Sequence, residues 1–406
     1  MSRMHIATLT VPALFLIIIL TGCAAGDIPA ETTPPSALPA VSPTPTRGTV
    51  RTKPAPTRRQ AFAHTPTTSP TSTQTKTSTP TFTTSPTPTL SETPTVTTLT
   101  PSPTAFNGAE PTLFPMSIEA MRLGSYPGSE ITVDEELEAG AGYRRYYVFY
   151  LSQGLKIYAL LTVPNGDPPD GGWPGIVFNH GYIPPDEYRS TERYIAYVDR
   201  LARSGYVVFR IDYRGHGNSE GDPQGAYGDP GYEVDVLNAL ASLKRFGQVN
   251  PDKIGMWGHS MGGYLTLRSM VISKDVKVGV IWAGVVAPYA DILYKWPAGP
   301  SVPPANSRKW MVDWPAQFGT PEQNPAFWAS ISANSYLADL SGPLQLHYGT
   351  QDEDVPPEFS ETLAEQVVAV GRNIEIYAYP GDNHNLSNYF NLAMDRTIEY
   401  FDRYLK

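Results

Sequence analysis

The chain has 406 residues, a net charge of −9, 41 prolines and a single cysteine. One cysteine supports neither a disulfide framework nor a thiolate metal site. Residues 1–112 carry 7 basic and 4 acidic side chains, whereas residues 113–406 carry 23 and 35. An acidic folded part without a basic run argues against nucleic acid as a partner.

The first 22 residues have the pattern of a secretory signal peptide. Arg3 supplies a short basic region, and the apolar run at 11–20 is too short to span a bilayer. The run ends in LTGC at Cys23, which resembles the lipobox of bacterial lipoproteins, where the cysteine is lipidated and becomes the new N-terminus. We therefore expect residues 1–22 to be removed and Cys23 to anchor the chain on the extracellular face of a bacterial membrane. The alternative is a plain signal peptide with a chance cysteine.

Threonine and proline dominate the next segment, with 27 Thr and 17 Pro among the 89 residues of 24–112. Such a composition cannot bury enough apolar surface to offset the entropy lost on ordering. It predicts a disordered, partly polyproline-II stalk over 23–112, with a reach on the order of 200 Å when fully extended. Its hydroxyl groups are candidates for O-glycosylation.

Strands and helices alternate in residues 113–406. Apolar runs predict strands at 143–151, 155–164, 175–181, 206–212, 253–258, 276–282, 343–349 and 373–380. Helical spacing predicts helices at 191–204, 234–243, 261–272, 358–370 and 393–404. The alternation favours one α/β domain with a mostly parallel sheet covered on both faces. Function in such sheets lies beyond the carboxyl ends of the strands, where His180, Asp212, Ser260, Asp352 and His384 are expected.

Residues 288–339 interrupt this alternation. Four of the seven tryptophans lie there, namely Trp296, Trp310, Trp314 and Trp328. A long connection of this kind is often a lid or a binding wall. The alternative is a packed helical excursion with a small core of its own.

Residues 258–262 read Gly-His-Ser-Met-Gly and fit the pattern G-x-S-x-G between an expected strand and an expected helix. A sharp strand-to-helix turn strains the backbone of the serine, and small residues two positions away avoid clashes. The turn also places the N–H of Met261 at a helix N-terminus, where it can point at a developing oxyanion. We therefore predict that Ser260 is a nucleophile and that Gly258 and Gly262 form its elbow.

A serine nucleophile needs a base, and the base needs an acid that orients it. His384 follows the last expected strand, and the chain order Ser, acid, His makes it the expected base. His347 lies within a strand and is expected to be packed, while His259 adjoins the nucleophile and is expected to point elsewhere. Asp352 is the expected acid, since it lies three residues after Gly349 at a strand end.

Other carboxylates compete for the role of the acid. Asp354 belongs to the same acidic run, and Asp382 is an outside candidate. The run 352–354 could also be a metal site or a solvated turn, but no further ligands at set spacing accompany it. No metal and no organic cofactor are therefore expected. Just past the pair His180-Gly181, Tyr182 is expected to give the second oxyanion N–H, and its phenol could line the pocket.

Three stretches carry a family resemblance: VNPDKIGMWGHSMGGYLTL, SISANSYLADLSGPLQLHYGTQDEDVP and YPGDNHNLS. Over about 143–406 the chain resembles the catalytic domain of the prolyl oligopeptidase (S9) family of serine peptidases. The resemblance implies an α/β-hydrolase fold and cleavage of short peptides. By motif it matches Ser260 to the nucleophile, Asp352 to the acid and His384 to the base of that family.

The chain departs from the family pattern in three places. Full-length members usually carry a β-propeller before the hydrolase, where this chain has the Thr/Pro segment. The oxyanion loop reads His-Gly-Tyr-Ile at 180–183, where the family often has HGGP. The stretch YRGHGNSEG at 213–221 looks more like esterases and dienelactone-hydrolase relatives.

These observations lead to the hypothesis of a lipid-anchored serine hydrolase that forms an acyl-enzyme. A peptidase acting on short peptides is favoured, and a carboxylesterase acting on small or carbohydrate-linked esters is the alternative. A non-catalytic surface binding module would predict erosion of the triad positions, yet all three are present. The sequence leaves the oligomeric state open.

Overall fold

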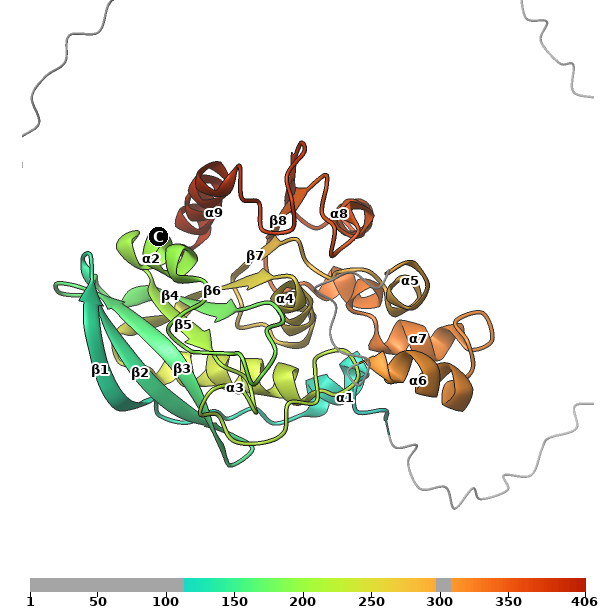
Figure 1. The fold of residues 1–406 in the computed structure, drawn as a ribbon, viewed down its shortest axis with the longest axis horizontal. Coiled ribbons are helices and arrows are strands. Elements are labelled where there is room, and N and C mark those ends of the chain that lie inside the picture. The colour runs from blue at the N-terminus through green and yellow to red at the C-terminus, as the bar shows by residue number, and fades with distance from the viewer. Residues whose placement is uncertain (1–112, 297–307) are drawn as a thin grey trace, which may run out of the picture. The chain divides into compact units, whose positions relative to one another are not determined.

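The computed structural model describes residues 113–296 and 308–406 (Figure 1). The expected signal peptide, Cys23 and the Thr/Pro segment lie outside the described residues, so the domain boundaries at 22 and 112 stay predictions. The chain divides into two units, Met1–Leu99 and Thr100–Lys406, and every described residue belongs to the second.

The described residues form a nine-stranded sheet. The strands are β1 (Thr132–Gly140), β2 (Tyr143–Ser152), β3 (Leu155–Pro164), β4 (Trp173–Asn179), β5 (Val207–Ile211), β6 (Val249–His259), β7 (Val278–Trp282), β8 (Leu344–Gly349) and β9 (Ile374–Tyr379). Their order in the sheet is β1-β2-β3-β5-β4-β6-β7-β8-β9. The pairs β1-β2, β2-β3 and β3-β5 are antiparallel. The remaining pairs, β5-β4, β4-β6, β6-β7, β7-β8 and β8-β9, are parallel. The mostly parallel sheet of the predicted α/β fold is therefore confirmed.

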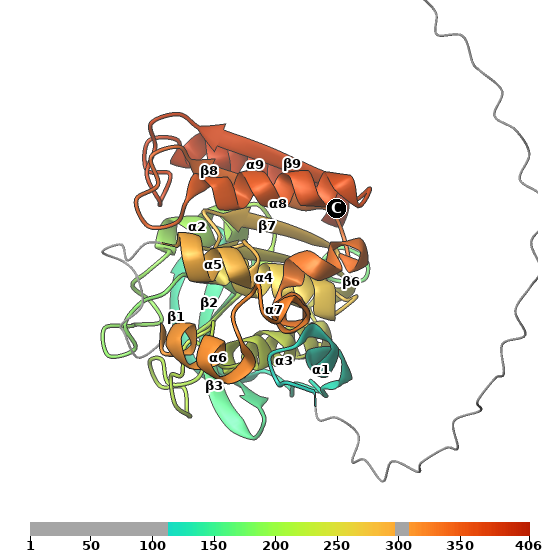
Figure 2. The same cartoon turned by 90° about the vertical axis from the view of Figure 1, so that its right-hand side faces the viewer.

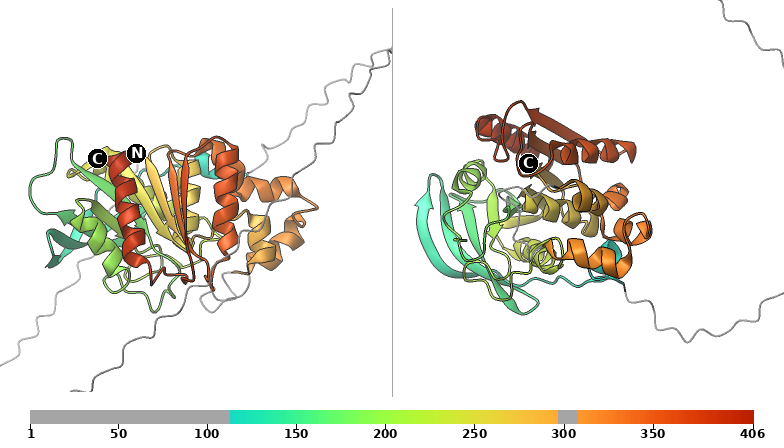
Figure 3. Two further views of the ribbon diagram at one scale, coloured as in Figure 1. Left: turned by 90° about the horizontal axis from the view of Figure 1, so that it is seen from above. Right: turned by 45° about the vertical axis from the view of Figure 1, so that its right-hand side comes forward.

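Helices cover both faces of this sheet. They are α1 (Ile118–Leu123), α2 (Ile195–Arg203), α3 (Gly231–Arg245), α4 (Met261–Ile272), α5 (Tyr289–Lys295), α6 (Trp310–Phe318), α7 (Pro325–Ile331), the 3₁₀ helix η2 (Ala333–Asp339), α8 (Pro357–Ala369) and α9 (Phe390–Leu405). The buried side chains of α2 and α9 pack into one apolar cluster, and those of α3, α4 and α8 pack into another. The left view of Figure 3 shows α9 and α8 on opposite sides of the strands. Because both faces are covered, β5 and β7 are buried along their whole length.

Strand β1 and helix α1 were not predicted from the sequence, and helix α2 begins later than expected. Strand β1 is exposed along almost all of its length and carries two register shifts, so it has no hydrophobic alternation to reveal it. Helix α1 is only six residues long. Helix α2 begins at Ile195, whereas 191 was expected, because Tyr194 has a left-handed backbone conformation (φ 59°, ψ 22°) that cannot continue a helix.

The described residues of 288–339 form α5, α6, α7 and η2. Helices α5, α6 and α7 lie together (Figures 1 and 2), α7 contacts η2, and η2 contacts α4. The four tryptophan side chains are at most 7 % exposed and join the apolar cluster of α3 and α4. Arg268 of α4 ties these helices down, since its guanidinium donates to the carbonyl oxygens of Ile331 and Met116 and lies 2.9 Å from the Glu233 carboxylate. The described part of this segment is thus continuous with the main core.

Candidate active site

Ser260 stands alone between the end of β6 and the start of α4. Its φ of 55° and ψ of −117° form a strained conformation for a residue with a side chain. The end of β7 holds this turn, because the Ser260 N–H donates to the Trp282 carbonyl at 3.0 Å and the Ser260 carbonyl accepts from the Val285 N–H at 3.2 Å. The backbone therefore presents the serine on a sharp strand-to-helix turn.

Gly258 and Gly262 are required by close backbone packing at this turn. A Cβ at Gly258 would lie 2.2 Å from the carbonyl oxygen of Gly262. A Cβ at Gly262 would lie 1.9 Å from the carbonyl oxygen of Asn179, at the end of β4. A side chain at 258 would push α4 away from the end of β6, and a side chain at 262 would push the turn away from β4.

His384 and Asp352 are brought together from two loops. Asp352 follows β8, and His384 lies between β9 and α9. The Nδ1 atom of His384 lies 2.8 Å from Oδ2 and 3.0 Å from Oδ1 of Asp352, and the two side chains are only 7 % and 1 % exposed. Oδ1 also accepts from the N–H groups of Asp354 and Val355, both at 2.9 Å. The carboxylate is thus oriented by the backbone, and Nε2 is the ring nitrogen left for a serine proton.

The outside candidate Asp382 has a different place. Its carboxylate accepts from the N–H groups of Asn383, Asn388 and Tyr389 and from the side-chain amide of Asn388. These bonds hold the loop that carries His384 in its conformation, so Asp382 stabilises the loop and does not contact the imidazole as the acid. Asp354 lines the cavity described next, and its carbonyl accepts from the Trp296 indole at 2.8 Å.

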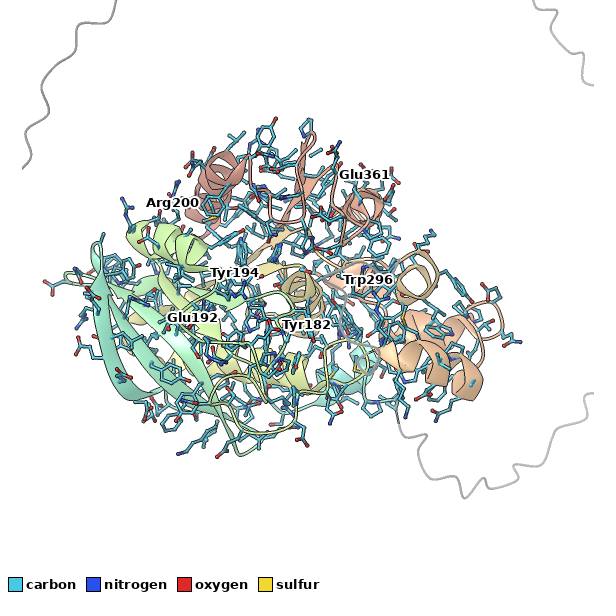
Figure 4. The ribbon with its side chains drawn as sticks, viewed as in Figure 1. Tyr182, Glu192, Tyr194, Arg200, Trp296 and Glu361 are labelled. Atoms are coloured by element: carbon cyan, nitrogen blue, oxygen red, sulfur yellow. The ribbon has the colours of Figure 1, made fainter. Side chains whose placement is uncertain are left out.

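Ser260 and His384 open into one cavity of about 360 Å³. Its lining is Gly181, Tyr182, Ile183, Arg193, Tyr194, Tyr197, His259, Ser260, Asp354, His384 and Asn385. Among the described residues, none of 288–339 is part of that lining. Figure 4 marks Tyr182 and Tyr194, which come from the loop after β4 and from the start of α2.

Of the two expected oxyanion donors, Tyr182 lines this cavity, and Met261 directly follows Ser260, which also lines it. Met261 is the first residue of α4, where a backbone N–H has no acceptor within the helix. The N–H of Gly181 already donates to the Tyr194 hydroxyl at 2.9 Å. Tyr182, the next residue of that loop, therefore stays the candidate for the second donor.

The expectation that His259 points away from the site is wrong. Its Nδ1 lies 2.8 Å from the Tyr194 hydroxyl, and its Nε2 lies 3.0 Å from the carbonyl oxygen of His384. Burial, followed by the nearby His384, lowers the pKa of His259 to about 3. Its only sequence signal was its position at the end of a buried strand. His347 is buried as expected, between the Tyr379 hydroxyl and the Gln345 side chain.

Within 113–296 and 308–406, no three His, Cys, Asp or Glu side chains are grouped so that they could hold a metal ion. The helices of these same ranges all lack the length and apolar character needed to cross a bilayer.

Comparison with curated proteins finds peptidases. The chain is 26 % identical over 201 residues to the uncharacterized peptidase YuxL of Bacillus subtilis, covering 46 % of this chain and 27 % of YuxL. It is 25 % identical over 242 residues to the uncharacterized peptidase YtmA of the same organism, covering 59 % of this chain and 86 % of YtmA. Human dipeptidyl peptidase 8 is 23 % identical over 252 residues, covering 59 % and 26 % of the two chains. The chain thus spans about a quarter of YuxL and dipeptidyl peptidase 8, but most of YtmA.

Solved structures give the fold. An acetyl xylan esterase from Paenibacillus sp. R4 superposes with a TM-score of 0.54 at 18 % identity, covering 70 % of this chain and 92 % of the esterase. The Pyrococcus horikoshii acylaminoacyl peptidase gives 0.52 at 20 % identity, covering 66 % and 42 %. Dipeptidyl peptidase 4 of Porphyromonas gingivalis gives 0.51 at 22 % identity, covering 65 % and 36 %. At these identities the likeness establishes the α/β-hydrolase fold alone.

The family follows from the sequence itself. The profile of the prolyl oligopeptidase family matches residues 193–406, which is just over half of the chain. The matched stretch contains Ser260, Asp352 and His384. The chain therefore belongs to the prolyl oligopeptidase family.

Proposed function

We propose that this protein is a serine hydrolase that cleaves short peptides through an acyl-enzyme. The observation that carries the proposal is the contact of Asp352 with His384, whose side chain lines one cavity together with a strained Ser260. Ser260 Oγ attacks the acyl carbon while Nε2 of His384 takes its proton, and Asp352 holds the imidazole in the required tautomer. The N–H groups of Met261 and Tyr182 stabilise the oxyanion. His384 then returns the proton to the leaving group and activates the water that releases the acyl-enzyme.

The peptide substrate is favoured by membership of a peptidase family and by the relatives named as peptidases. The cavity of about 360 Å³ suits a small substrate. A carboxylesterase is the second candidate, because the oxyanion loop departs from the family pattern at 180–183. The match to most of an acetyl xylan esterase makes carbohydrate-linked esters the first esters to test.

A substrate panel tests both candidates. The protein and a Ser260→Ala variant are incubated with aminoacyl and dipeptidyl anilides, with acetylated xylan and with p-nitrophenyl esters of rising chain length. We expect anilide turnover by the wild type and a loss of about 10⁶-fold in kcat for Ser260→Ala, as found when a serine nucleophile is removed. Turnover of esters alone would select the carboxylesterase. Full activity of Ser260→Ala would remove both proposals.

We also propose that a lipid on Cys23 anchors the enzyme to the outer face of a bacterial membrane, with the Thr/Pro segment as a spacer. The support is the LTGC sequence after a short apolar run. In a bacterial host fed an alkyne-tagged fatty acid, the wild type is expected to take up the tag and Cys23→Ala to take up none. Ser260→Ala is the matched control and should be tagged like the wild type. Equal tagging of Cys23→Ala would exclude this anchor.

A further inference from the structure

We infer that Tyr194 and His259 are positioning residues. They link the oxyanion loop after β4 to the loop that carries His384, across the end of β6, directly before Ser260. The inference rests on the proposed function and concerns how its parts are held in register. Three contacts carry it: Gly181 N to Tyr194 Oη at 2.9 Å, Tyr194 Oη to His259 Nδ1 at 2.8 Å, and His259 Nε2 to the His384 carbonyl at 3.0 Å.

Every proton in this link has one possible place. The N–H of Gly181 can only donate, so the Tyr194 oxygen accepts from it. The carbonyl of His384 can only accept, so Nε2 of His259 carries a proton. In the neutral ring Nδ1 is then an acceptor, and the hydroxyl of Tyr194 donates to it. No donor competes with another along the chain of bonds.

The link adjoins the candidate oxyanion donor, the base and the nucleophile. Gly181 directly precedes Tyr182, the candidate oxyanion donor. The carbonyl that His259 binds belongs to His384 itself, and His259 directly precedes Ser260. The imidazole is 3 % exposed, and its ring centre lies 4.6 Å from that of His384. A shift of one loop is therefore passed through a single buried ring to the other.

The backbone of Tyr194 supports the same conclusion. Its left-handed conformation is unusual for a residue with a large side chain, so its surroundings must hold it in place. The ring packs edge-on against Phe178 at 5.6 Å and Trp257 at 6.2 Å, which leaves the hydroxyl between Gly181 and His259. Space is tight at that point, because a Cβ on Gly181 would lie 2.8 Å from the same hydroxyl.

The His259 ring is neutral at neutral pH. Burial, and then the proximity of His384, lowers the pKa of His259 to about 3. Burial also raises the pKa of the Tyr194 phenol well above neutrality. Both groups therefore keep the protons that the link requires at neutral pH.

Variants that cut the link at one shared bond test the inference. Tyr194→Phe removes the hydroxyl, and His259→Gln removes the Nδ1 acceptor while its amide nitrogen can still donate near the former Nε2 position. The readouts are kcat and KM on p-nitrophenyl butyrate and the rate of labelling by a fluorophosphonate probe. We expect each single variant to lower kcat and the labelling rate by about 10- to 100-fold, since small misplacement of catalytic groups is costly, with KM changed by less than about 3-fold.

The double variant Tyr194→Phe/His259→Gln provides the sharper result. Because both changes break the bond between Tyr194 and His259, the double variant should lose little more than Tyr194→Phe alone. His259→Asn removes the other bond of the imidazole. Its side-chain oxygen can still accept from Tyr194 near the Nδ1 position, but the donor to the His384 carbonyl is lost. Because cutting either bond already separates the two loops, Tyr194→Phe and His259→Asn together should also lose little more than the larger single loss.

Tyr206→Phe is the matched control. Its hydroxyl donates to Asp402 at 2.5 Å outside the cavity, so the loss of this hydroxyl should leave kcat unchanged. Thermal midpoints are measured for all variants, and if Tyr194→Phe fails to fold, His259→Gln and His259→Asn carry the test.

Wild-type kcat in the single variants, or a loss confined to KM, would overturn the inference. Multiplied losses in Tyr194→Phe/His259→Gln would do the same. A wild type that the fluorophosphonate does not label overturns the proposed function and the inference together. A labelled wild type with unchanged variants overturns the inference alone.

Discussion

Asp352→Asn is expected to lower kcat by about 10⁴-fold while KM and the folded structure stay nearly unchanged. The amide has the shape of the carboxylate, and its oxygen can still accept from the N–H groups of Asp354 and Val355. Its NH₂ group, however, would then face Nδ1 of His384, which lies 2.8 Å from Oδ2 of Asp352. The ring responds by moving its proton to Nε2, which can no longer accept a proton from Ser260.

Steady-state kinetics on the best substrate of the panel measures this effect, and circular dichroism checks the fold. Asp354→Asn is the informative companion, because Asp354 is the competing acid of the same run. If Asp354→Asn showed the 10⁴-fold loss and Asp352→Asn did not, the assignment of the acid would have to be exchanged. If neither variant lost more than about 10-fold, His384 would not depend on a carboxylate in the usual way.

The elbow, the sheet and the Asp–His contact could be predicted because each has a short-range or ordered signal. Gly258 and Gly262 are needed for contacts within one turn and with the adjacent strand, so sterics alone fix the motif. Buried parallel strands are apolar without interruption, and loops after such strands meet at one edge of the sheet. These rules place Asp352 beside His384 without any knowledge of the loops.

The link through Tyr194 and His259 had no such signal. Tyr194 is one of 24 tyrosines and is placed by a left-handed turn that helical periodicity hides. The role of His259 depends on the path of the loop after β9, more than one hundred residues later in the chain. Strand β1 is a similar case, since its exposed side chains carry no alternation and backbone pairing with β2 alone defines it.

The buried histidines lead to a second effect: as the pH falls, the free energy of unfolding should decrease by on the order of 1–2 kcal/mol per pH unit around pH 5.5. Burial lowers the pKa of four of the five histidines in the described ranges, namely His180, His216, His259 and His347. Below a pH of about 6.5 the unfolded chain binds protons on these four side chains, whereas folding keeps His180, His259 and His347 neutral well below that pH. The stability that the neutral rings contribute is therefore present above this pH and is lost as the pH falls.

Three buried carboxyl groups act in the opposite direction, because burial raises the pKa of Asp212, Glu233 and Asp235. Burial raises the pKa of Asp212 to about 6 and that of Glu233 to about 7, so at pH 5.5 the folded chain holds up to two protons that the unfolded chain has released. Their contribution is full below the unfolded pKa and is lost as pH rises through these folded values. Three histidine protons against about two carboxyl protons leave the unfolded chain with about one more, which is worth about 1.4 kcal/mol per pH unit. His216 adds to this difference and Asp235 subtracts from it.

Urea denaturation at pH 7.0, 6.0 and 5.5 measures the balance. The midpoint should fall with pH while the m-value stays constant, because the surface exposed on unfolding does not change. His347→Gln is the matched variant, since it removes one buried titrating ring that contacts Gln345 and Tyr379, away from the cavity. It should make the pH dependence shallower by about 1.4 kcal/mol per pH unit, even though the variant is less stable at neutral pH. A midpoint that rises toward pH 5.5 would mean that the protons on Asp212 and Glu233 outweigh those refused by the histidines.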